Sequence, residues 1–309
     1  MRKALISLAA TASCALFIVI VIGSVTIIAQ STITGDWKAD ARPDKEGNKD
    51  GKIYVSFERS DENGRNQHGS NYSPEELGLR RDQMQNGKVS FRLVREAGTV
   101  DADGTFTDGR GTGTFRFTPD MGFVAAMKSR GFDFDRRVHR NDETIEERLL
   151  TAALINVTTA LADDLNSANF GKLEVEDLYK AAIFKIDGKF MAEMKATGFP
   201  NLQMEDLVKA RIFKIDADYV RQVRDMGFDN REFEGLVKFR IFKVTPEFLG
   251  ELKNAGLANL DSEDIVKCRI FHIDGEFVRK ARAQDPNVSL EDMVRMKIGV
   301  RKVKTDSWQ

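Results

Sequence analysis

The chain has 309 residues, of which 41% are hydrophobic and 31% are charged, and its formal net charge at pH 7 is −1. This composition is typical of a folded protein with room for two domains, and it excludes a wholly disordered chain. The near-neutral balance also argues against nucleic acid as a partner, because a protein that neutralises phosphates needs a surplus of basic side chains.

The first 30 residues predict an export signal. Arg2 and Lys3 precede a largely apolar run from Ala4 to Ala29. Such a run is typical of a signal peptide, and it is also long enough to span a bilayer. The sequence leaves open whether the segment is cleaved after Ala29 or retained as a transmembrane anchor. In both cases the positive-inside tendency places the rest of the chain in the periplasm or outside the cell.

The exported part is expected to gain its stability from packing rather than from a disulfide. Cys14 lies within the leader, which leaves Cys268 as the one cysteine of the mature sequence. An intramolecular disulfide is therefore excluded even in an oxidising compartment.

Residues 31–117 predict a small antiparallel β domain. Apolar and polar side chains alternate in three stretches, which are Lys52–Arg59, Val89–Val94 and Gly113–Phe117. Alternation of this kind predicts half-buried strands. Glycines 104 and 109, with 111 and 113 after them, are interpreted as hairpin glycines, since glycine permits the positive φ that tight turns need. A sandwich and a barrel-like sheet both remain open.

Two features of this domain are weighed as binding sites. Gly35-Asp36-Trp37 resembles the Gly-x-Trp near the first strand of lipocalin-type barrels, so Trp37 is a candidate for binding a small apolar ligand. The alternative is that Trp37 fills the base of a small core. The polar run from Glu62 to His68 is interpreted as a solvated loop, because it contains the turn signal Asn-Gly and lacks an apolar anchor.

Residues 118–300 predict a tandem repeat. Similar segments begin at Phe190, Tyr219 and Phe248, at a constant interval, and a second column of isoleucines keeps the same interval. Two independent columns with one period indicate repeats of about 29 residues. An earlier copy around Phe123 is displaced by an insertion within the charged stretch 133–147, which we expect to be a loop. A degenerate copy begins at Phe277, and residues 301–309 form a tail.

Each unit is expected to be a pair of short helices. Thr245-Pro246 offers an N-cap followed by the proline favoured at the first helical position, and Phe248 and Leu252 lie on one helical face. The second half of a unit begins with acidic residues such as Glu263-Asp264, which favour a helix N-terminus. Stacked pairs would bury a continuous core, to which the repeated phenylalanines and isoleucines are assigned. The predicted fold class is therefore α+β, a small β domain followed by an α-solenoid of about six units.

The repeats also carry basic residues in register. Lys209, Lys238 and Lys267 each follow a glutamate by four residues, so pairing within the helix is expected. Three arginines have no such partner in the sequence. They and two further lysines are the candidate residues for contact with a protein partner: Arg211, Arg240, Arg269, Lys214 and Lys243.

No catalytic or metal-binding pattern is present in the sequence. His68, His139 and His272 are widely separated, and Cys268 has no partner for a zinc site. P-loop, dinucleotide-binding and Gly-x-Ser-x-Gly motifs are missing. We therefore expect no cofactor, no metal and no enzymatic activity. An enzyme that uses unrecognised carboxylates remains an alternative.

The repeat pattern Phe-x3-hydrophobic-x3-Gly-Phe, followed by Asp206-Leu-Val-Lys-x-Arg-Ile-Phe213, resembles repeats that follow the protease portion of some bacterial envelope regulators, the beta-lactam-sensor-like membrane metallopeptidases. The segment Gly113–Pro119 is similar to the one that often precedes them. This chain lacks their several membrane spans and their His-Glu-x-x-His. The resemblance therefore implies a non-enzymatic sensing or docking module of the cell envelope, with small-ligand binding by the β domain as the alternative.

Overall fold

The computed structural model describes residues 32–42, 51–61, 64–135, 143–199, 201–228 and 233–299. The predicted leader with its cleavage point, the middle of the charged insertion and the C-terminal tail lie outside these ranges. Within them, no helix combines the length and apolar character needed to cross a membrane.

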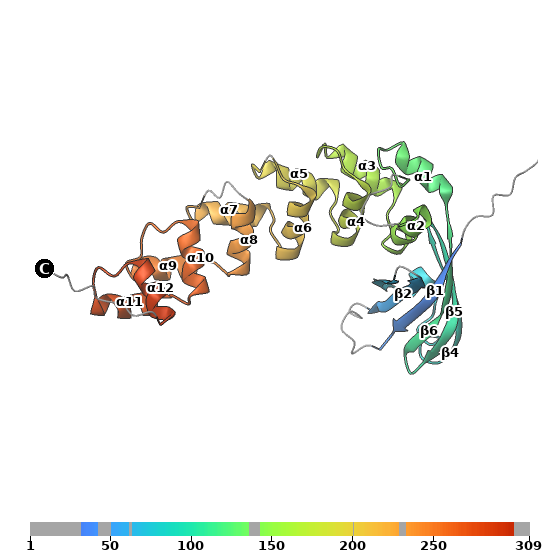
Figure 1. Ribbon diagram of the computed structural model, residues 1–309, viewed down its shortest axis with the longest axis horizontal. Helices are drawn as coiled ribbons and strands as arrows, with labels where there is room; N and C mark the ends of the chain where they lie inside the picture. The colour runs from blue at the N-terminus through green and yellow to red at the C-terminus, as the bar shows by residue number, and fades with distance from the viewer. Residues whose placement is uncertain are drawn as a thin grey trace, which may run out of the picture. The chain divides into compact units, whose positions relative to one another are not determined.

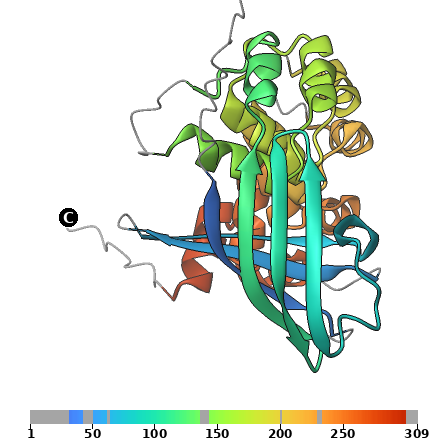
Figure 2. The same cartoon turned by 90° about the vertical axis from the view of Figure 1, so that its right-hand side faces the viewer.

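Six strands form the N-terminal part of the described chain (Figure 1). They are β1 (Ile33–Asp40), β2 (Ile53–Asp61), β3 (Gly64–Tyr72), β4 (Gly87–Arg95), β5 (Gly98–Thr107) and β6 (Arg110–Pro119). The strand order is β3-β2-β1-β6-β5-β4, and every neighbouring pair is antiparallel. The described strands therefore belong to one twisted sheet with edges at β3 and β4 (Figure 2), where the sequence left a sandwich and a barrel open.

The sheet corrects two local predictions. The polar run that ends at His68 was expected to be a loop, but Gly64–Tyr72 is strand β3, paired along its whole length with β2. Asp103 and Gly104 were expected at a turn, yet they lie inside β5. Pairing with an established neighbour outweighs the weak strand preference of polar residues and glycine. The turn at Asp108-Gly109 is confirmed, with φ values of 49° and 75°.

Helices form the rest of the described chain. They are α1 (Met121–Lys128), α2 (Ile145–Leu154), α3 (Thr159–Ser167), α4 (Val175–Phe184), α5 (Gly188–Ala196), α6 (Met204–Phe213), α7 (Ala217–Asp225), α8 (Phe233–Ile241), α9 (Pro246–Asn254), α10 (Ser262–Ile270), α11 (Gly275–Gln284) and α12 (Leu290–Lys297). Odd-numbered helices pack on odd-numbered ones, as α1 on α3 and α3 on α5, whereas α4, α6, α8 and α10 pack in succession on one another. The architecture is thus a mixed α+β fold with a repeat-like helical part.

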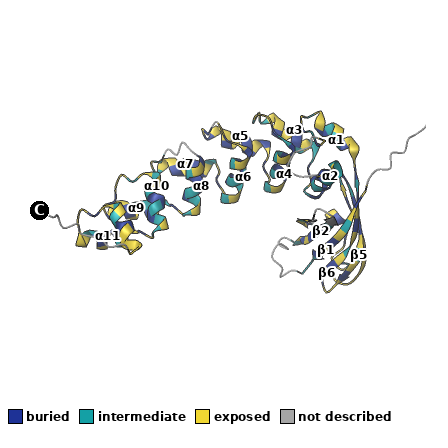
Figure 3. Ribbon diagram, in the orientation of Figure 1, coloured by how far each residue is buried: buried dark blue, intermediate teal, exposed yellow. Residues whose placement is uncertain are grey.

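The predicted helix caps are confirmed. Thr245 accepts the Phe248 amide at 3.3 Å, with Pro246 at the first helical position of α9. Asp187, Asp216 and Asp274 accept amides in the same way at 2.7–2.8 Å and begin α5, α7 and α11. These caps satisfy amides that a helix N-terminus leaves unpaired. The helices are short and individually marginal, so packing of their buried faces holds them in place (Figure 3).

Helix α2 joins the helical part to the sheet. It packs on β3, β5 and β6, and the Tyr72 hydroxyl donates to the Leu154 carbonyl oxygen at 3.0 Å. Burial raises the pKa of Tyr72, so this hydroxyl stays protonated as a donor. Leu154 is 3% exposed. It stands 29 residues before Ile183.

Candidate partner-binding surface

A column of exposed isoleucines runs along the even-numbered helices. Each side chain lies at the C-terminal end of its helix, and each is about half exposed: Ile183 (55%), Ile212 (53%), Ile241 (49%), Ile270 (47%) and Ile298 (55%). We call these five residues the isoleucine column. The sequence assigned the repeated isoleucines to the core, and that prediction is wrong. Their phenylalanine neighbours, such as Phe213 and Phe242, are the side chains that pack against the core.

The column holds most of the exposed large hydrophobic side chains. The described ranges contain nine of them, and five belong to the column. Single exposed apolar residues need no explanation, whereas a set that recurs at the ends of successive even-numbered helices is a candidate interaction surface. Leu154, 29 residues before Ile183, is 3% exposed, and its helix α2 packs on the sheet. The chain therefore uses this position once for its own packing and leaves it open on later helices.

The three arginines predicted to contact a partner are half-buried and form contacts within the chain. Their guanidinium groups lie 3.6–3.7 Å from the ring centroids of Phe190, Tyr219 and Phe248. Each also donates from Nη2 to a backbone carbonyl of an earlier helix end: Arg211 to Lys185 at 2.6 Å, Arg240 to Lys214 at 2.8 Å and Arg269 to Lys243 at 2.6 Å. The sequence offered these side chains no partner, whereas the structure gives each of them two.

The acceptors of these bonds adopt an unusual backbone conformation. Lys185, Lys214 and Lys243 end their helices with φ between 51° and 57°, in the left-handed region that lysine rarely visits. His272 shares this conformation, with φ of 53°. The conformation ends the helix and leaves the carbonyl available to the arginine. Their side chains are exposed. Lys214 and Lys243, both predicted partner-binding residues, thus stand beside the isoleucine column as cations.

The other lysines form a ladder between helices. Lys209 binds Glu234 at 2.7 Å, Lys238 binds Glu263 at 2.7 Å, and Lys267 binds Glu291 at 2.6 Å. Lys180 binds Glu205 in the same manner. The expected pairing with the glutamate four residues earlier is therefore wrong, because each lysine reaches a glutamate on the next even-numbered helix. Lys267 also pairs within its own helix, with Asp264 at 3.4 Å. The hydrogen bond to Glu234 raises the pKa of Lys209. Exposed pairs of this kind are worth about 0–1 kcal/mol each, so their main effect is to neutralise the charge of these lysines.

Trp37, the predicted ligand-binding residue, lies in the close-packed core of the sheet. It is 1% exposed, and its Nε1 donates to the Asp103 carbonyl oxygen at 3.0 Å. Phe91 and Phe106 contact the indole, with ring centroids 5.1 and 5.8 Å away. A Cβ atom added at Gly104, Gly111 or Gly113 would come within 2.5–2.6 Å of the indole. These strand glycines make room for Trp37, so the interpretation of all of them as hairpin glycines is wrong.

A polar cluster lies where β2 and β3 face α2. Arg59 and Glu147 form an ion pair, and the His68 ring lies 3.5 Å from the Thr151 hydroxyl. Burial lowers the pKa of His68, and the nearby Glu143 carboxylate opposes that shift. Glu147 also completes the capping box of α2 by accepting the Thr144 amide at 2.7 Å. Sequence reasoning missed this cluster because β3 was expected to be a loop.

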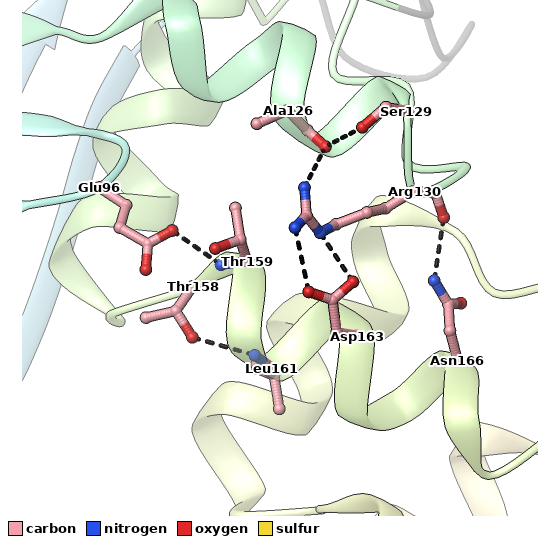
Figure 4. A network of polar contacts seen from close by, with 9 residues as sticks. All are labelled: Glu96, Ala126, Ser129, Arg130, Thr158, Thr159, Leu161, Asp163 and Asn166. Carbon is pink, nitrogen blue, oxygen red and sulfur yellow. Dashed lines mark hydrogen bonds and ion pairs between the residues drawn. The ribbon is translucent and has the colours of Figure 1, made fainter.

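A second polar network joins α1 to α3 (Figure 4). Arg130 donates to both carboxylate oxygens of Asp163, at 2.8 and 3.0 Å, and to the Ala126 carbonyl oxygen at 2.9 Å. Glu96, in the turn between β4 and β5, accepts the Thr159 amide at 2.8 Å. Every group in this network has a partner within the chain, so the network has a structural role at the start of the helical part.

The described residues offer little for metal or thiol chemistry. Among them, no group of three or more His, Cys, Asp or Glu side chains is arranged to hold a metal ion. Cys268 is fully buried, and burial raises the pKa of its thiol to about 11. A thiol in that state is a poor nucleophile at neutral pH.

A cleft of about 500 Å³ opens beside β3. The strand itself forms one wall, from Gln67 to Tyr72, and the C-terminal ends of α2 and α4 form the other, with Leu154 and Ile183 among the lining residues. Lys52 and Lys185 are its charged residues, and none of the lining residues is acidic. The cleft thus begins where the isoleucine column begins.

No protein-family model matches this chain, and none of the curated proteins compared with it is a significant relative. The function is therefore inferred from the surface itself.

Proposed function

We propose that this protein is a non-enzymatic interaction module of the cell envelope. In this proposal, about six two-helix units stack as a solenoid, one unit to each repeat period, and present the isoleucine column to a protein partner. The observation that carries the proposal is the column itself, five branched apolar side chains exposed on successive even-numbered helices. A repeat protein has no need to expose them for its own stability, because each unit is stabilised by contacts with its neighbours.

The column has the properties of a binding strip. Packed helices stand roughly 8–10 Å apart, so neighbouring isoleucines are close enough to be covered by one partner segment. Covering a half-exposed isoleucine removes apolar surface from water at about 25 cal/mol per Å². Several such side chains together supply a useful binding free energy, and the polar residues around them set specificity.

The charges beside the column favour an acidic partner. The lysine ladder is neutralised by its glutamates. By contrast, Lys185, Lys214 and Lys243, each two residues after an isoleucine of the column, are exposed, and they form no ion pair with another described residue. The predicted arginines support this surface from within, because their bonds fix the helix ends that carry these lysines.

The proposed location rests on the sequence. The basic pair and apolar run of residues 2–29 support export, and the resemblance of the repeats to those of envelope regulators supports the envelope as the compartment. Attachment to the membrane through the same segment is part of the proposal.

Site-specific photo-cross-linking tests the proposal. A photoreactive amino acid would replace Ile212 or Ile241 in the full chain, expressed in its own host. Both positions should give one discrete cross-linked protein. The control is Lys189 on the odd-numbered helix α5, whose side chain is 83% exposed. No cross-link from the isoleucine positions, or the same product from Lys189, would contradict the proposal.

A further inference from the structure

Strand β3 is an exposed sheet edge. It is the last strand in the order, and in the described part of the chain its backbone pairs with β2 alone. In an antiparallel edge strand, every second residue directs its N–H and C=O away from the sheet. Residues 66, 67 and 69–71 are exposed, and the strand contains no proline to block pairing. Natural proteins usually protect such an edge, because another strand readily adds to it.

The cleft lies along this open edge. Six consecutive residues of β3, Gln67–Tyr72, line one wall, so a chain lying in the cleft would run beside their outward backbone groups. The volume of about 500 Å³ suits a few residues of extended peptide. The opposite wall offers apolar contact from Ile183 and Leu154.

The charge of the cleft favours an acidic peptide. Lys52 and Lys185 are exposed at its rim, and the residues that line it include no carboxylate. Free carbonyl groups at helix ends would add negative potential to the cleft. Two of them already accept hydrogen bonds, the Leu154 carbonyl from Tyr72 and the Lys185 carbonyl from Arg211. The two ammonium groups therefore dominate, and they complement an acidic segment.

We propose that the cleft binds an extended acidic segment of the partner, which adds as a strand to the edge of β3. Backbone hydrogen bonds to β3 supply part of the affinity, a branched apolar side chain contacts Ile183, and carboxylates meet Lys52 and Lys185. This inference rests on the proposed function, since it names the kind of segment that a protein partner would place at the start of the isoleucine column.

Peptide selection on the full chain tests the inference. A displayed library of random heptapeptides would be selected on the protein and, in parallel, on the Lys52→Glu/Lys185→Glu variant. We expect sequences that alternate Val, Ile or Thr with Asp or Glu. The synthetic form of the most enriched peptide should bind the double variant at least tenfold more weakly than the parent. It should bind the charge-matched control Lys189→Glu/Lys253→Glu as tightly as the parent. Placing proline at its centre should abolish binding, because proline removes a pairing N–H.

Hydrogen exchange provides the structural readout. Addition of the selected peptide should slow exchange of amides between Gln67 and Tyr72. The inference is overturned if no sequence is enriched, if enriched sequences lack an acidic excess, or if binding leaves β3 exchange unchanged. Failure here differs from failure of the proposed function, because the cross-links from Ile212 and Ile241 test the column without using the cleft.

Discussion

The sheet and the helical part are stabilised in different ways. In the sheet, Trp37 fits against three glycines and two phenylalanines that come from three other strands, and this arrangement occurs once. In the helical part, one set of contacts recurs, with an arginine on an aromatic ring and a lysine on the next glutamate. A change in the sheet therefore removes a unique contact, whereas a change in a helix removes one of several. The column recurs too, yet contributes little to packing, which is why we assign it to binding.

The largest expected effect is in the sheet. Trp37→Ala should lower the free energy of unfolding by about 3–5 kcal/mol, because it leaves a cavity among residues that cannot collapse onto it. Chemical denaturation followed by circular dichroism measures the change. Val94→Ala, at a side chain that is 63% exposed on β4, is the control. A loss no greater than that of the control would mean that the sheet does not depend on the indole.

In the helical part, Arg240→Ala should cost about 1–3 kcal/mol, since it removes a charged hydrogen bond and a cation–π contact. Arg221→Ala removes an arginine from α7 whose side chain is 70% exposed, and should cost less than about 0.5 kcal/mol. Thermal unfolding of the two variants provides the comparison. Equal stabilities would show that the contacts of Arg240 do not stabilise the packing of the helices, and would make Arg240 a candidate for partner binding again.

The polar cluster should make stability depend on pH. The pKa of His68 is lowered in the folded chain, so below the ordinary value of 6.5 the unfolded chain binds a proton that the folded chain resists. Stability should therefore fall as pH drops below 6.5. His68→Gln should reduce this decline, whereas His272→Gln, at an exposed helix end, should leave it in place. If stability fell equally with pH in the His68 variant and the parent, His68 would not be the source of the pH dependence.

The smallest expected effect concerns a left-handed helix end. Lys214→Asn should raise stability by up to about 1 kcal/mol, because asparagine tolerates φ near 53° better than lysine does. Lys189→Asn, within α5, should be neutral or slightly destabilising. Unfolding midpoints of both variants would be compared. A destabilised Lys214 variant would show that the lysine side chain stabilises the helix end more than its backbone conformation costs.

Much of the helical part could be predicted because its signals are local. A capping threonine before a proline, such as Thr245-Pro246, and an aspartate three residues before a buried aromatic act within one turn. Contacts between units could not be predicted in this way. Lys209 has one glutamate a helical turn earlier and another, Glu234, on the next even-numbered helix. It pairs with Glu234 because α6 packs on α8.

Exposure was harder to predict than secondary structure. Ile212 and Phe213 are adjacent and both apolar, yet one points to solvent and the other packs against the core. In the sheet, Gly104 and Gly113 resemble turn residues in the sequence, although their purpose is to admit Trp37 from another strand. Both errors have one cause. Whether such a residue is buried or exposed depends on contacts with residues that are distant in the sequence.

The central claim is that the isoleucine column binds a partner and does not stabilise the fold. The most direct test is the Ile212→Ser/Ile241→Ser variant of the full chain, assayed for affinity to the protein cross-linked at those positions and for its free energy of unfolding. We predict at least a tenfold loss of affinity, with stability within about 1 kcal/mol of the parent, as expected for exposed sites. Unchanged affinity, or a loss of affinity that merely follows a collapse in stability, would contradict the claim.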